Sequence, residues 1–148
     1  FDILNYISGK VEWNYVSTIK DVNKYLATVA LGKGIKGVTI QLDSCFNAPD
    51  NFSINIIAGN ERLEMRPIEV TSLYSGMEVN EPTQEMPIRL YTPMLQNKII
   101  DMPEQGHKPG FLGQAQDFMN FCLGRKDCTG ADIMDAYSAL KLAHSLVK

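Results

Sequence analysis

The residues whose spacing most resembles a chemical motif are the glycines of Gly32-Lys33-Gly34-Ile35-Lys36-Gly37. This segment matches G-x-G-x-x-G, which binds the pyrophosphate of a dinucleotide when a strand precedes it and a helix follows it. Here Val38, Ile40 and Leu42 alternate with polar residues after the glycines, which is typical of a strand. We therefore expect a strand-to-strand hairpin. We expect no NAD or NADP binding by this chain alone.

The two histidines, His107 and His144, have no Ser, Cys or carboxylate nearby at a spacing that suggests a catalytic triad. His107 lies in a segment flanked by glycine and proline, and two interpretations stay open for it. It is either a solvated loop residue or a weak candidate for substrate binding, because loops on a rigid scaffold often carry sites. His144 is predicted in the last turn of the last helix, where a cation suits the helix dipole. No catalytic residue is predicted.

The cysteines are three in number, Cys45, Cys122 and Cys128, and none forms a C-x-x-C pair. An odd number makes a poor disulfide framework. We expect no zinc site, because the chain has two histidines and no C-x-x-C. The composition therefore favours a reducing, cytoplasmic compartment. The sequon Asn51-Phe52-Ser53 is too common a pattern to predict glycosylation.

The composition is that of a folded globular protein, with 45% hydrophobic and 21% charged residues in 148. Fourteen basic and 17 acidic residues leave a formal net charge of −3, and they are scattered along the chain. A nucleic-acid binder more often gathers Lys and Arg in a stripe. No apolar run approaches the roughly 18 residues of a membrane span. We expect neither a nucleic-acid nor a membrane partner.

Period-two patterns predict a run of strands through the middle of the chain. The expected strands cover residues 11–15, 25–31, 38–42, 52–56, 63–65, 68–79, 88–91 and 98–102. Gly59-Asn60 predicts a hairpin turn. Trp13 and Tyr15 are interpreted as core or interface residues on one side of the first strand.

Helical spacing of apolar residues predicts helices at both ends of the chain. The first helix covers residues 1–8 and ends at Gly9, with Asp2 interpreted as its N-cap. The second covers residues 111–123, and the last follows Thr129, its candidate N-cap. Strands in a run followed by helices predict an α+β fold, with an open, largely antiparallel (mixed) sheet, helices packed on one face and a polar, free opposite face.

The free face of this sheet is expected to carry the polar members of the strands. These residues are Thr39, Gln41, Asp43, Ser53, Asn55, Arg62 and Glu64. We expect this face to pack on a second copy of itself, as isologous two-fold interfaces do. A solvated face would have the same pattern, and that alternative stays open.

Three stretches, taken in order, resemble the C-terminal domain of the glucose–fructose oxidoreductase / inositol dehydrogenase (Gfo/Idh/MocA) family. The opening Phe1-Asp2-Ile3-Leu4-Asn5-Tyr6-Ile7-Ser8-Gly9 is similar to the tail of the family's H-x-x-D-hydrophobic-x-x-x-x-G segment. The strands around Gly32 to Gly37, followed by residues 52–63, are similar to its sheet. The segments 110–118 and 129–132, with the Ala/Leu-rich helix after them, are similar to its last two helices. The resemblance covers essentially the whole chain.

The resemblance implies that residues 1–148 are the C-terminal substrate-binding and oligomerisation domain of a two-domain NAD(P)-dependent oxidoreductase. Such enzymes act on a sugar or cyclitol hydroxyl, and their NAD or NADP and catalytic lysine belong to an N-terminal Rossmann domain that is absent here. The family histidine would fall two residues before Phe1, so the chain is expected to be truncated and inactive by itself. By resemblance, Asp2 lies near the sugar hydroxyls, a role compatible with an N-cap. We expect a homo-oligomer.

The alternative is a domain of another class, a non-catalytic binding or assembly domain that uses a sheet face as its interface. The oxidoreductase domain and the binding domain predict similar properties for this chain. They differ in what they predict for the full-length protein to which the chain belongs. A βαβ region with a glycine fingerprint upstream of Phe1 would favour the enzyme, whereas independent translation from near Phe1 would favour the binding domain.

Overall fold

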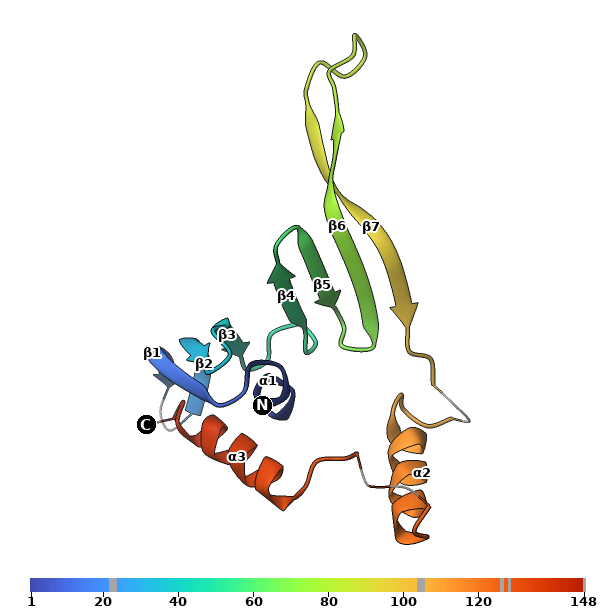
Figure 1. Cartoon of the computed structure of the whole chain (residues 1–148). Helices are drawn as coiled ribbons and strands as arrows, with labels where there is room; N and C mark the ends of the chain where they lie inside the picture. Colours follow the sequence, from blue (N-terminus) through green and yellow to red (C-terminus); the bar gives the residue numbers. More distant parts are fainter. Residues whose placement is uncertain (22–23, 104–105, 126, 128, 148) are drawn as a thin grey trace. The chain divides into compact units, whose positions relative to one another are not determined.

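A computed structural model of the chain describes residues 1–21, 24–103, 106–125, 127 and 129–147. These residues form three helices and seven strands in antiparallel sheets, which confirms the α+β class (Figure 1). They divide into unit 1, Phe1–Pro49 with Gly124–Lys148, and unit 2, Asp50–Leu123. The single sheet expected from the sequence is replaced by two sheets, one in each unit. The segment between them contains Asn47, at φ 65°, and Pro49, which do not suit a continuing strand.

Unit 1 contains a three-stranded sheet in the order β1-β2-β3. Its strands are β1 (Val11–Asp21), β2 (Lys24–Gly34) and β3 (Thr39–Cys45). The registers pair Trp13 with Gly32, and Gly32 with Ile40, so these three residues share one face of the sheet. Gly32 leaves room for the Trp13 ring, because a Cβ built at Gly32 would lie 2.6 Å from the Cε3 atom of Trp13.

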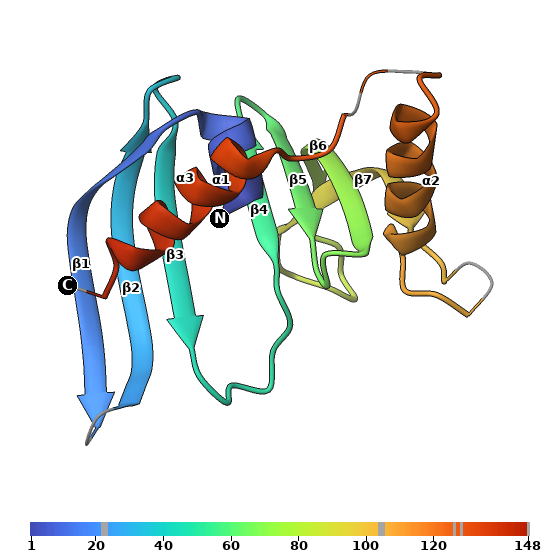
Figure 2. The same cartoon turned by 90° about the horizontal axis from the view of Figure 1, so that it is seen from below.

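Two helices of unit 1 lie on one face of this sheet (Figure 2). The first, α1 (Asp2–Ser8), ends at Gly9, whose positive φ of 70° favours glycine, as predicted. The other, α3 (Ile133–His144), has Asp132 as its N-cap. The Asp132 carboxylate accepts hydrogen bonds from two backbone N–H groups of the first turn, and Asp135 accepts one from the backbone of Asp132. This capping box makes the predicted N-cap at Thr129 wrong.

The core of unit 1 lies between this sheet face and the helices. Val11, Ile40 and Leu142 are buried together, and Leu4 and Trp13 pack against them. Ala30 and Leu146 are buried as well. Full burial of an aliphatic side chain contributes roughly 1.5–3 kcal/mol. Unit 1 therefore has an apolar core of its own, and the expectation of helices on one sheet face is confirmed there.

Unit 2 contains a four-stranded sheet in the order β4-β5-β6-β7. Its strands are β4 (Ile54–Ala58), β5 (Glu61–Met65), β6 (Val70–Asn80) and β7 (Leu90–Ile100). The predicted hairpin at Gly59-Asn60 is confirmed by the direct pairing of β4 with β5. Beyond Gly76, β6 and β7 pair only with each other and continue past the shorter strands (Figure 1). We call residues 76–94 the arm.

Unit 2 differs from unit 1 in the burial of its apolar side chains. Among its described residues no apolar side chain is buried, and the buried residue is Ser72. The helix of this unit, α2 (Phe111–Cys122), follows Gly110 and precedes Gly124, both at positive φ. None of its twelve residues is buried, although its sequence forms an apolar stripe.

Candidate functional site

Asp2, the substrate-binding residue implied by the resemblance, is the first residue of α1 and is exposed. The carbonyl of Phe1 accepts the first intrahelical hydrogen bond, from the backbone N–H of Asn5 at 3.1 Å, so Phe1 is the N-cap. The interpretation of Asp2 as N-cap is therefore wrong, because a capping residue must lie just outside the helix. Its carboxylate instead lies in the first turn, where a negative charge suits the helix dipole.

The glycine motif forms the β2–β3 turn, which confirms the hairpin. Gly34 donates to the carbonyl of Val38, and Gly37 donates to the carbonyl of Gly34. The backbone of the turn also bonds to the chain that joins α1 to β1, through the carbonyls of Ser8 and Lys10. A Cβ at Gly34 would collide with the backbone of Ser8. The glycines thus permit close contact between two backbone segments, and a strand, β3, follows them where a dinucleotide site needs a helix.

The histidines belong to different units. His107 is an exposed residue of unit 2, in the segment between β7 and α2. His144 is exposed in the last turn of α3 in unit 1, as predicted. Asp2 and His107, the two predicted substrate residues, belong to different units. Their substrate roles stay predictions.

The described cysteines, Cys45 and Cys122, are free and exposed, while Cys128 lies outside the described residues. Within the described part of the chain, no three His, Cys, Asp or Glu residues are grouped so that they could hold a metal ion. The same part has no helix long and apolar enough to cross a membrane.

The face of the three-stranded sheet opposite the helices is exposed, but it is not polar as expected. Thr39, Gln41 and Asp43 share this face, as predicted, because they alternate with Ile40 and Leu42 along β3. The registers add four exposed apolar residues to it: Tyr15, Ile19, Val29 and Leu31. We call these seven residues the Tyr15 face.

Tyr15 reaches this face because β1 contains a bulge. Trp13 pairs with Gly32, and Tyr15 pairs with the adjacent Leu31, so the register shifts at Asn14. Neighbouring residues of β2 point to opposite faces, and the shift therefore places Trp13 and Tyr15 on opposite faces too. Trp13 packs at the core, whereas Tyr15 is 56% exposed. The expectation that both share one side of the strand is wrong.

One face of the four-stranded sheet combines charged and apolar side chains. The registers place Asn55, Ile57, Arg62, Glu64, Ser72, Tyr74, Leu95, Lys98 and Ile100 on it. We call this set the Arg62 face. Asn55, Arg62 and Glu64 share it as predicted, but Ser53 precedes β4 and lies outside the sheet.

Arg62 is the centre of the polar contacts on this face. Its Nη2 atom lies 3.5 Å from the Glu64 carboxylate, and its guanidinium lies 4.3 Å from the centroid of the Tyr74 ring. The Arg62 Nε atom is buried and has no hydrogen-bond partner among the described residues. About a third of each charged side chain is exposed. The cation–π contact contributes about 0.5–1 kcal/mol at such a site and holds the guanidinium in place.

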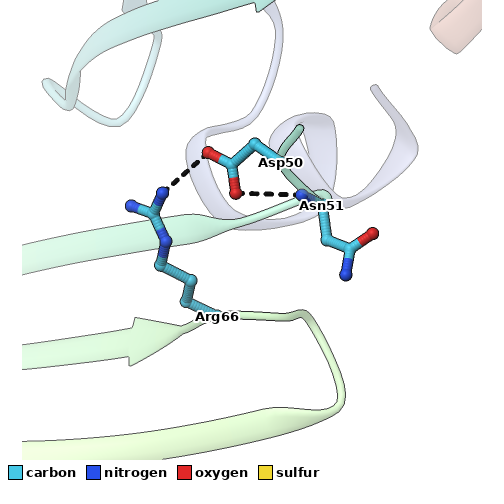
Figure 3. Close-up of polar contacts among 3 residues, drawn as sticks. All are labelled: Asp50, Asn51 and Arg66. Carbon is cyan, nitrogen blue, oxygen red and sulfur yellow. Dashed lines mark hydrogen bonds and ion pairs between the residues drawn. The ribbon is translucent and has the colours of Figure 1, made fainter. Parts of the chain in front are cut away.

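A second ion pair of unit 2 holds the start of the unit against the end of β5 (Figure 3). The Asp50 carboxylate accepts hydrogen bonds from Arg66 Nη2 at 2.7 Å and from the backbone N–H of Asn51 at 2.9 Å. Both charged side chains are at least half exposed, so the pair contributes at most about 1 kcal/mol. This contact is structural.

Comparison with known proteins identifies no relative: no family model, no curated protein and no solved structure matches the chain.

Proposed function

We propose that the chain is the substrate-binding and oligomerisation domain of an NAD(P)-dependent oxidoreductase that acts on a sugar or cyclitol hydroxyl. The observation that carries the proposal is the Tyr15 face. In unit 1 the helices lie on one side of the sheet, and the other side leaves Tyr15, Val29 and Leu31 exposed. Apolar residues grouped on an exposed face, with polar residues beside them, are typical of an interface between subunits.

The cofactor in this proposal belongs to a Rossmann domain of the parent protein. The glycine turn of this chain does not suit NAD or NADP, because it leads into β3 and its Gly34 lies against Ser8. Calorimetric titration of the 148-residue chain with NAD and NADP is expected to give no binding. Micromolar affinity would contradict this placement of the cofactor.

Sedimentation at several concentrations tests the assembly part of the proposal. The chain is expected to self-associate, and a Tyr15→Ser/Leu31→Ser variant is expected to weaken association about 10- to 100-fold if these residues are central to the interface. Tyr6→Ser is the matched control, because Tyr6 is a highly exposed aromatic residue of α1 outside this face. A chain that stays monomeric at high micromolar concentration would contradict the assembly function.

Asp2 tests the substrate part in the full-length parent. Because Asp2 is not the N-cap of α1, Asp2→Ala is expected to leave the melting temperature nearly unchanged. A charged acceptor of sugar hydroxyls contributes roughly 1.5–3 kcal/mol, so kcat/KM should fall about 10- to 100-fold. Steady-state kinetics with NAD or NADP and a panel of sugars and cyclitols measures this. Unchanged kcat/KM would remove Asp2 from the substrate site.

The alternative, a non-catalytic binding or assembly domain, is favoured by one observation. The two candidates for substrate contact, Asp2 and His107, are both exposed. The gene upstream of Phe1 distinguishes the two functions. A βαβ region with a glycine fingerprint that leads into a helix favours the oxidoreductase.

A further inference from the structure

We draw no further inference here: the strongest candidate, the apolar side of the arm formed by Met77, Val79, Tyr91 and Pro93, is an open surface patch on the β6–β7 ribbon, and nothing in the described part of the structure shows what covers it.

Discussion

Unit 1 and unit 2 are both built from antiparallel strands and helices, but their apolar side chains differ in burial. In unit 1, Val11, Ile40 and Leu142 are buried between a sheet and helices. In unit 2, the described apolar residues are all exposed or partly exposed, even on strands as long as β6 and β7. Burial of apolar area is the main favourable contribution to folding. We infer that unit 1 is stabilised by its own core, whereas unit 2 gains burial through association.

The largest expected effect on stability comes from a substitution in the core of unit 1. Leu142 is 7% exposed and packs with Val11 and Ile40, so Leu142→Ala should lower the free energy of unfolding by about 2–5 kcal/mol. Leu140 is on the same helix but 70% exposed, and Leu140→Ala should change it by less than about 0.5 kcal/mol. Urea unfolding followed by circular dichroism measures both. Equal effects would mean that α3 does not stabilise unit 1 through its buried face.

A substitution in the glycine turn of the same unit is expected to have a smaller effect on stability. A Cβ at Gly34 would meet backbone atoms of Ser8, which cannot move as a flexible side chain does. Gly34→Ala should therefore cost about 1–3 kcal/mol of stability through overpacking. The midpoint of urea unfolding, compared between the variant and the original chain at an unchanged m value, measures this cost. A neutral substitution would remove the structural explanation of this glycine and reopen the question of a ligand at the turn.

The smallest expected effect on stability comes from α2, the exposed helix of unit 2. Here the substitution is expected to stabilise the protein rather than destabilise it. A Cβ at Gly113, inside α2, meets nothing within 4 Å. Because none of the α2 residues is buried, its stability should follow intrinsic propensity, and Gly113→Ala should stabilise the helix by about 0.5–1 kcal/mol. Amide hydrogen exchange of α2 measures the change, with Ala115→Gly as the reverse substitution. A loss of protection in Gly113→Ala would indicate that this position needs glycine for contact with a partner.

Local patterns predicted most of the elements. The alternation after Gly37 identified β3, and with it the hairpin at the glycine motif; the turn at Gly59-Asn60 was equally clear. These features depend on residues a few positions apart, which propensity and turn chemistry describe well. The cap of α3 was missed because Thr129 and Asp132 are both capping residue types, and only the hydrogen bonds with Asp135 distinguish them.

The remaining differences between the sequence prediction and the structure arise from strand pairing between segments that are far apart in the sequence. The bulge at Asn14 reverses the face of Tyr15, and nothing in the alternation of Val11, Trp13 and Tyr15 indicates it. The contact of Arg62 with Tyr74 depends on the pairing of β5 with β6, and the arm exists because β6 and β7 are longer than their neighbours. A period-two pattern assigns a residue to a side of its own strand but does not specify which strand lies beside it.

Amide hydrogen exchange as a function of protein concentration tests the difference between the units most directly. Peptides from β1–β3 and α3 should exchange slowly at every concentration, because the core of unit 1 is complete in one copy. Peptides from β6 and β7 should exchange quickly at concentrations where sedimentation finds monomer, and should become more protected as association proceeds. Equal protection of β6–β7 and β1–β3 in the monomer would contradict the inference that unit 2 gains its burial from a partner.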